Sequence, residues 1–256
     1  MSDGGGDGIE LVEITDPQAD PDLLRALFDT VLRPSFSTDE LPSIELLERG
    51  ALAGQEQTIV VAVDGAGPAC AAVYGRPVGS PVGVLSYLAS RPGERGRGLG
   101  GRVLTRVLDI AAASTVELVL GEVHDPRWYA ETADEQPTAR LRFYERLGAT
   151  ALSVPWMQPR LSPAGDRVRD MLLLAHYATP SLLRAGVPST WLAAWTEGYY
   201  VEEEGAIPDD AEYLALMARM TAEPTIALIP VSEVDSLERL ALSGDGGART
   251  TDPPRT

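Results

Sequence analysis

The chain contains no lysine: all 21 basic residues among its 256 are arginine. This absence excludes several phosphate and cofactor chemistries. The ATP-binding P-loop requires a lysine before serine or threonine, protein kinases require a lysine at the ATP phosphates, and pyridoxal-phosphate enzymes require a Schiff-base lysine. A phosphate site in this chain must therefore be built from arginine and from the backbone.

Cysteine and histidine are also scarce. The single cysteine, Cys70, cannot build a disulfide framework. The two histidines, His124 and His176, come without a cysteine cluster, so we expect no metal site. No apolar run reaches the roughly 18 residues of a membrane span, and the acidic, glycine-rich residues 1–8 are the reverse of a signal peptide. We expect a cytoplasmic protein with a flexible N-terminus.

Negative charge outweighs positive charge, which gives a formal net charge of −17. Such an acidic chain is not expected to bind nucleic acid or an anionic membrane. An acidic surface attracts cationic substrates, although acidity also keeps a protein in solution, and both explanations stay open. The hydrophobic fraction of 44% is sufficient for a sizeable core.

Residues 95–101, Arg-Gly-Arg-Gly-Leu-Gly-Gly, form the most informative segment. Apolar residues recur at helical spacing directly after it, which predicts a helix over residues 102–112. The free N–H groups and the positive dipole end of that helix would face the glycines, an arrangement that binds phosphate. Residues 96–101 also satisfy the dinucleotide pattern G-x-G-x-x-G, but the strand predicted over residues 82–89 ends too early for that fold. A glycine-rich turn before an ordinary helix is the alternative.

A second motif occupies residues 139–149. Its apolar side chains share one face of a short helix, and Gly148 stands where a left-handed C-terminal cap belongs. Together the two motifs resemble those of the GNAT superfamily of N-acetyltransferases. Arg95, Gly98 and Gly100 fit its acyl-CoA loop, Gln/Arg-x-x-Gly-x-Gly/Ala, and the second motif fits its Phe-Tyr-x-x-x-Gly helix.

The resemblance implies acetyl-CoA as co-substrate and assigns roles to several residues. Tyr144 would protonate the departing thiolate, although a purely structural role in the core is the alternative. Backbone N–H groups at the end of the strand before the loop would bind the developing oxyanion. The implied cofactor-binding residues are Leu88, Ala89, Ser90, Arg95, Gly96, Arg97, Gly98, Leu99, Gly100 and Gly101.

Glu122 is the candidate general base for an amine nucleophile, because it lies near the end of the strand predicted over residues 116–123. It is equally able to pair with a substrate ammonium or to face solvent. His124 is two residues further along the strand, so its side chain points to the same face as that of Glu122. Histidine has an ordinary pKa suited to a general base, which makes His124 a second candidate. A purely structural histidine at a strand end is the alternative.

Two loops are candidates for the acceptor site. The loop at residues 125–136 carries four carboxylates together with Trp128, and would suit a cationic, partly apolar substrate. Asp39 and Glu40 lie between the first two predicted helices, where the superfamily often binds its acceptor.

The predicted element order, β-α-α-β-β-β-α-β-α-β-β, is α/β and matches the GNAT acyltransferase fold, a mixed and mostly antiparallel sheet flanked by helices. We expect this domain at residues 9–178, after the flexible residues 1–8. For residues 179–241 the sequence predicts a mainly helical extension with one strand. This extension would cover the substrate cleft, form a homodimer or add to the core. Residues 242–256 have the composition of a disordered tail.

The predicted function is acetyl transfer from acetyl-CoA to a primary amine of a small, cationic acceptor by direct attack in a ternary complex. Two alternatives stay open: a catalytically silent acyl-CoA-binding sensor or interaction module, and a transferase of a different acyl group. The absence of lysine fits either codon usage in a GC-rich genome or selection against self-acetylation. The sequence leaves the acceptor itself unnamed.

Overall fold

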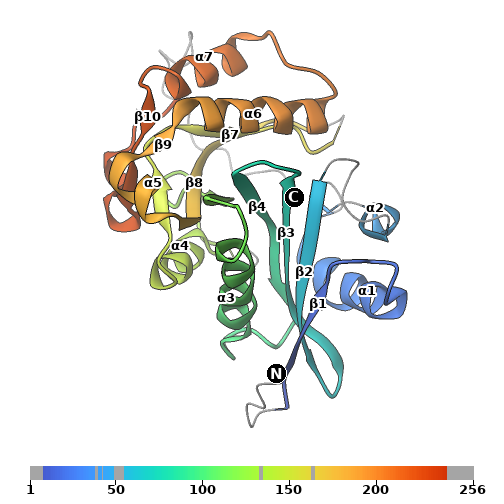
Figure 1. Cartoon of the computed structure of the whole chain (residues 1–256). Helices are drawn as coiled ribbons and strands as arrows, with labels where there is room; N and C mark the ends of the chain where they lie inside the picture. Colours follow the sequence, from blue (N-terminus) through green and yellow to red (C-terminus); the bar gives the residue numbers. More distant parts are fainter. Residues whose placement is uncertain are drawn as a thin grey trace.

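The computed structural model describes residues 8–37, 40–41, 43–48, 55–132, 135–162 and 165–240. In this part the chain builds a main sheet that is mixed and mostly antiparallel, in the order β1-β2-β3-β4-β5-β8-β6-β11 with β7 paired to β8, and a separate two-stranded sheet (Figure 1). The strands are β1 (Glu10–Ile14), β2 (Gln55–Asp64), β3 (Gly67–Pro77), β4 (Val82–Ser90), β5 (Leu118–His124), β6 (Thr150–Leu152), β7 (Trp156–Gln158), β8 (Val168–Ala178) and β11 (Leu228–Pro230).

Helices cover both faces of the sheet, which explains why the central strands are apolar on both sides. The first face packs against α3 (Leu99–Ala112) and α4 (Pro137–Arg146). The second face packs near its β1 edge against α1 (Pro21–Leu27) and the π-helical turn Phe28–Leu32. Figure 1 shows α1 and α3 on opposite sides of strands β1–β4.

Local sequence signals account for the helix ends. The Asp20 carboxylate caps α1 by accepting a hydrogen bond from the Leu23 N–H at 3.0 Å, as predicted from the Asp-Pro start. Gly148 has a φ of +87°, the left-handed conformation that the sequence predicts after α4. The helix expected near residues 44–52 is described as α2 (Ile44–Glu48); its later residues lie outside the described part.

Pro155 divides residues 150–158 into two short strands. The sequence predicts a strand near residues 151–158, but Pro155 separates β6 from β7, because proline has no N–H to donate to a ladder. Both short strands nevertheless pair with β8.

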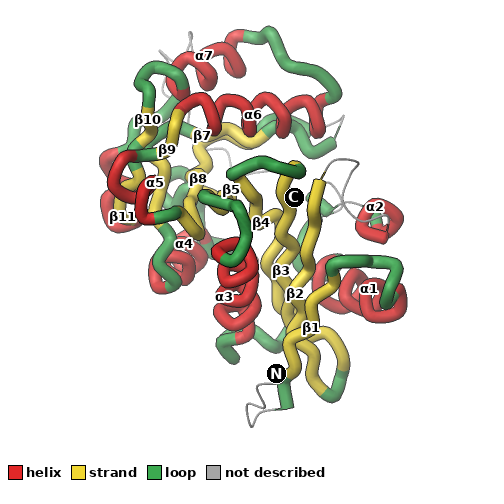
Figure 2. Tube along the Cα trace, viewed as in Figure 1, coloured by secondary structure: helices red, strands yellow, loops and turns green. Residues whose placement is uncertain are grey.

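The residues after Thr179 pack directly on the sheet. They form α5 (Pro180–Ala185), β9 (Val187–Pro188), α6 (Ser189–Glu204), α7 (Ala211–Met220), β10 (Thr225–Ile226), β11 and a 3-10 turn (Val231–Ser236). β11 adds an antiparallel strand to β6, and the buried Tyr200 hydroxyl of α6 donates to the Met157 carbonyl at 2.7 Å. Figure 2 shows α6 and α7 together beyond the ends of β2–β4.

The acidic end of α6 differs in part from expectation. The run Glu202-Glu203-Glu204 predicts a solvated helix end, and Glu202 and Glu203 are exposed. The Glu204 side chain is buried and accepts hydrogen bonds from Arg160 and Arg167. These arginines lower the pKa of Glu204 to about 2, with Arg167 the largest cause. Among the described helices, none has the length and apolarity needed to cross a membrane.

Candidate functional site

The site begins where β4 and β5 separate. These parallel strands pair only from Val82 to Val84 on one side and from Leu118 to Leu120 on the other, although both continue further. The register of β4 against β3 shifts at Ser86, which forms a bulge just beyond the last parallel pair. The separation therefore starts earlier in β4 than the sequence-based expectation of residues 88–90.

Beyond the bulge, β4 presents free backbone donors to the opening. The Arg91 N–H donates to the Ala69 carbonyl on β3 at 2.8 Å. Because N–H groups alternate sides along a strand, the N–H groups of Leu88 and Ser90 point away from β3, toward the side from which β5 has departed. Ala89 points its N–H toward β3 instead.

The glycine loop leads from β4 into α3. Gly96 and Gly98 have φ values of +85° and +76°, the left-handed region that glycine tolerates best. Gly98 is the N-cap of α3 and provides no side-chain hydrogen bond to the first turn. The first N–H groups of α3 are thus left for solvent or for an anion.

The two arginines of the loop have different surroundings. The Arg97 guanidinium pairs with the Glu94 carboxylate and lies 3.8 Å from the Asp64 carboxylate, so much of its charge is already compensated. Arg95 is exposed and makes no ion pair within the described part of the chain. Arg95 is therefore the better candidate for a ligand phosphate.

The two sequence motifs meet in the fold. A Cβ atom on Gly100 would lie 3.4 Å from the Phe143 ring, and one on Gly101 would lie 3.8 Å from Leu147. The glycines at the start of α3 thus let α4 approach closely. This contact places Tyr144, the next residue of α4, on the same face of the sheet as the glycine loop.

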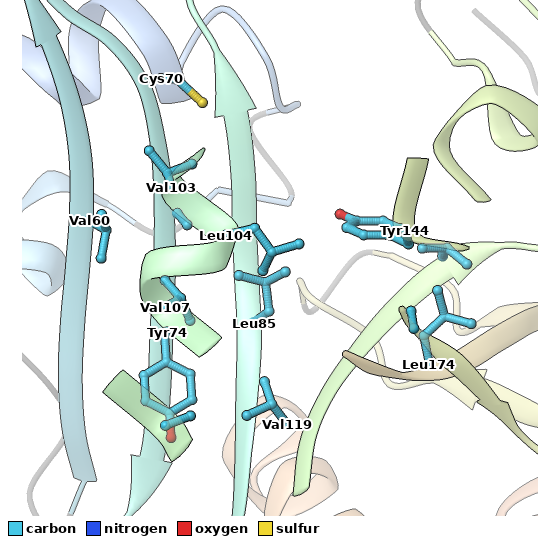
Figure 3. Close-up of a cluster of buried hydrophobic side chains, with 14 of the residues drawn as sticks. Val60, Cys70, Tyr74, Leu85, Val103, Leu104, Val107, Val119, Tyr144 and Leu174 are labelled. Carbon is cyan, nitrogen blue, oxygen red and sulfur yellow. The ribbon is translucent and has the colours of Figure 1, made fainter. Parts of the chain in front are cut away.

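Tyr144 is buried in this first-face core. Figure 3 shows its hydroxyl pointing toward Leu85 of β4 and Leu104 of α3, which belong to the same hydrophobic cluster. Burial raises the pKa of Tyr144 to about 12, so the phenol holds its proton at neutral pH. A protonated phenol beside the opening is able to donate to a leaving group.

Sequence reasoning missed His176, which packs against Tyr144. The two ring centroids are 4.5 Å apart. The register of β8 against β5 shifts at His176, and a Cβ on Gly121 would lie 2.2 Å from His176 Nε2, so only glycine leaves room for the imidazole. An isolated glycine within an apolar strand was the signal that could have found this close approach.

The His176 imidazole predicts an acid-dependent loss of stability. Burial lowers the pKa of His176 to about 4 from its ordinary 6.5. Because the folded pKa is the lower one, the unfolded chain takes up the proton first, and stability present above pH 6.5 is lost as pH falls toward 4. This difference between the unfolded and folded pKa values corresponds to a loss of about 3 kcal/mol in the free energy of unfolding. Urea unfolding from pH 7.5 to 4.5 should show the wild type losing stability relative to His176→Phe. Parallel curves would contradict a buried neutral imidazole.

A cavity of about 950 Å³ lies on the second face of the sheet. Its walls come from the first half of β4, from the far ends of β5 and β7, and from α6. Glu122 and His124 both line it, as their shared parity on β5 predicts. The place where β4 and β5 separate therefore lies between this cavity, with Glu122, and the opposite face of the sheet, which carries α3 and Tyr144.

Glu122 is held by neutral donors. Its Oε1 accepts from Trp156 Nε1 at 2.5 Å, and its Oε2 accepts from Gln158 Nε2 at 2.7 Å and from the Tyr199 hydroxyl at 3.1 Å. Burial raises the pKa of Glu122, and these hydrogen bonds partly oppose the rise. A carboxylate with a raised pKa is suited to accepting a proton near neutral pH.

His124 has a more structural setting. Its ring stacks on Tyr129 with a centroid distance of 4.2 Å, and its Nδ1 lies 3.2 Å from Glu135 Oε1. The Glu135 carboxylate also pairs with Arg140 at 3.0 Å. His124 is thus fixed at the cavity edge between an aromatic ring and a carboxylate.

The cavity is acidic and aromatic. The pKa of Glu203 is raised to about 7, first by partial loss of solvent and then by the nearby carboxylates of Glu202 and Glu122. Part of the Glu203 side chain still contacts solvent. The two arginines in the lining, Arg76 and Arg140, are paired with carboxylates that are not part of it. Carboxylate and aromatic lining residues are Glu40, Glu122, Asp166, Glu202, Glu203, Phe36, Tyr87, Trp191, Trp195 and Tyr199.

Of the residues predicted for the acceptor site, only some line the cavity. Glu40 lines the cavity, and its carbonyl accepts from the Tyr87 hydroxyl at 2.8 Å; Asp39 lies outside the described residues. Trp128 does not line the cavity: its half-exposed ring lies 4.1 Å below the Arg239 guanidinium. Of the α6 aromatics, Tyr200 packs in the core, whereas its neighbours Trp191, Trp195 and Tyr199 face the cavity.

The comparisons with known proteins identify the family and its fold. The sequence model of the Acetyltransferase (GNAT) family matches residues 24–149. A GNAT-family structure from Bacteroides thetaiotaomicron has 19% identity and a TM-score of 0.54, and the match covers 75% of this chain and 99% of that one. This chain belongs to the GNAT acetyltransferase family.

Further GNAT structures match with lower similarity. An acetyltransferase from Elizabethkingia anophelis with acetyl-CoA bound is 17% identical, with a TM-score of 0.42 and coverage of 67% of this chain and 99% of that one. The ribosomal-protein-S18-alanine N-acetyltransferase from Escherichia coli is 17% identical, with a TM-score of 0.43 and coverage of 64% and 92%. No curated protein matched the sequence.

Within the described residues, no group of three or more histidine, cysteine, aspartate and glutamate side chains is arranged to hold a metal ion.

Proposed function

We propose that the protein is an acetyl-CoA-dependent N-acetyltransferase that acts on a primary amine of a small cationic acceptor. Family membership supports acyl transfer in general. The observation that carries the specific proposal is the separation of β4 from β5, which lies between the glycine loop and Tyr144 on one face of the sheet and the Glu122 cavity on the other. A donor and an acceptor bound there would approach each other directly, without a covalent enzyme intermediate.

The donor side fits acyl-CoA. The uncapped first turn of α3 and the exposed Arg95 suit a pyrophosphate, and the N–H groups of Leu88 and Ser90 suit an acyl carbonyl that develops negative charge. Acetyl-CoA would supply the activated acyl group. The Tyr144 phenol, protonated because burial raises its pKa, would give its proton to the departing sulfur.

On the acceptor side, Glu122 is the proposed base. Three donors occupy its two oxygens, and since each carboxylate oxygen has two lone pairs, Oε1 keeps one for an ammonium proton or a bridging water. Its raised pKa improves it as a base. The proton removed from the ammonium frees the nitrogen lone pair for attack.

Charge and shape of the cavity favour a cationic acceptor with an apolar portion. Its carboxylates outnumber its arginines, and both arginines are already paired. Aromatic faces from α6 are able to stack on apolar groups or to contact a cation. A volume of about 950 Å³ suits a small molecule.

Matched amines test the acceptor class. We expect primary amines that carry a second positive charge to react with higher kcat/KM than neutral amines of the same length, by roughly tenfold, the effect of about 1.4 kcal/mol of charge pairing. The measurement is free thiol release with mass-spectrometric detection of the acetylated product. Equal or faster reaction of the neutral amines would contradict a cationic acceptor. Tight acetyl-CoA binding without turnover for any amine would favour the silent acyl-CoA-binding module.

A further inference from the structure

His176 carries a buried polar atom that has no partner. Its side chain is 5% exposed, and Nδ1 makes no hydrogen bond to any described residue. An unpaired buried nitrogen costs free energy, and such atoms in native proteins commonly await a water or a ligand. A phenylalanine would fill a similar space without this cost, so the polar ring calls for a functional explanation.

The position of the imidazole points to the donor side. Gly121, which accommodates it, is the first residue of β5 beyond the pairing with β4. The Tyr144 ring packs on it, with centroids 4.5 Å apart. His176 therefore lies next to the point where β4 and β5 separate, on the same face of the sheet as α3.

The chemistry of the imidazole restricts the ligand class. Burial keeps the ring neutral at pH 7, and a neutral imidazole has one donor and one acceptor nitrogen. Tyr144, the titratable group packed against it, is also neutral there. Such a site suits uncharged amide or thioester groups and does not suit a phosphate, which the glycine loop serves.

We propose that His176 Nδ1 is a hydrogen-bonding contact for the neutral acyl-pantetheine arm of the bound acyl-CoA, satisfied only in the complex. The inference rests on the proposed function, because it requires that acyl-CoA bind in the opening between β4 and β5. It adds a residue from β8, outside the segment matched by the family, to the donor site.

Calorimetry on the full chain at pH 7.5 tests the contact. His176→Phe should bind acetyl-CoA roughly five- to tenfold more weakly, the value of one neutral hydrogen bond. Its affinity for ADP, which has the pyrophosphate but lacks the pantetheine arm, should be unchanged, and its thermal stability without ligand should be maintained or raised. His176→Leu, with a smaller side chain, gives the same comparison if the phenyl ring is not accommodated.

Tyr74→Phe is the matched control. The Tyr74 hydroxyl is another buried, unpartnered polar atom of the same core, placed on β3 against Gly83. Its removal should leave acetyl-CoA affinity unchanged. The inference is overturned if both His176 variants bind acetyl-CoA within about twofold of wild type, or if ADP and acetyl-CoA affinities fall together. A wild type that binds no acetyl-CoA would overturn the proposed function itself, a separate result.

Discussion

Gly98→Glu is expected to abolish acetyl-CoA binding. Gly98 is the N-cap of α3 and has a φ of +76°. Because glycine has no side chain, it caps none of the N–H groups in the first turn of α3. A glutamate there would place a carboxylate at the positive end of the helix, where it would compete with and repel a pyrophosphate. The unfavourable backbone conformation would add about 1–2 kcal/mol of strain. Calorimetry should show affinity reduced by at least about a hundredfold.

Gly205→Glu is the control for backbone strain. Gly205 has a φ of +84° at the C-terminal end of α6, and no atom within 4 Å would meet its Cβ. The substitution therefore imposes a similar conformational cost away from the loop. It should lower thermal stability and leave acetyl-CoA affinity unchanged. Unchanged affinity in Gly98→Glu would remove the glycine loop from the donor site.

Tyr144→Phe is expected to lower kcat by about a hundredfold, the range of a lost general acid. The ring stays in the core and only the proton donor is removed, so KM for acetyl-CoA and the melting temperature should change little. Steady-state thiol release measures both constants. Tyr213→Phe is the control, because Tyr213 is also buried and its hydroxyl also lacks a partner. Wild-type kcat in Tyr144→Phe would return Tyr144 to a purely structural role.

The features predicted from sequence are those determined by neighbouring residues. The Asp20 cap, the left-handed Gly148 and the α3 helix after the glycine loop all depend on interactions within a few positions of the chain. The family resemblance depends on two such local motifs.

The features missed depend on distant segments. The Glu204 side chain is buried because Arg160 and Arg167 approach it from another part of the chain. His176 adjoins Tyr144 only because β8 inserts between β5 and β6 and bulges there. No pattern of residues within a short window specifies such pairings, since they arise from the register of the whole sheet.

The extension also lines the cavity on the second face of the sheet, and covering a cleft is one of the three roles that the sequence left open for it. Tyr199 of α6 donates to Glu122, although the two residues are distant in the chain. Three aromatic residues of α6, Trp191, Trp195 and Tyr199, face the cavity. Which element lies opposite them is determined by the packing of distant segments and required the structure.

Amine-dependent release of free thiol from acetyl-CoA is the most direct measurement of the central claim. The purified protein is incubated with acetyl-CoA and a panel of primary amines, and thiol release is compared with and without each amine. The account predicts release that requires an amine, yields the N-acetylated product by mass spectrometry, and falls in Tyr144→Phe. Release that is absent with every amine, or that is equal in their absence, would contradict N-acetyl transfer.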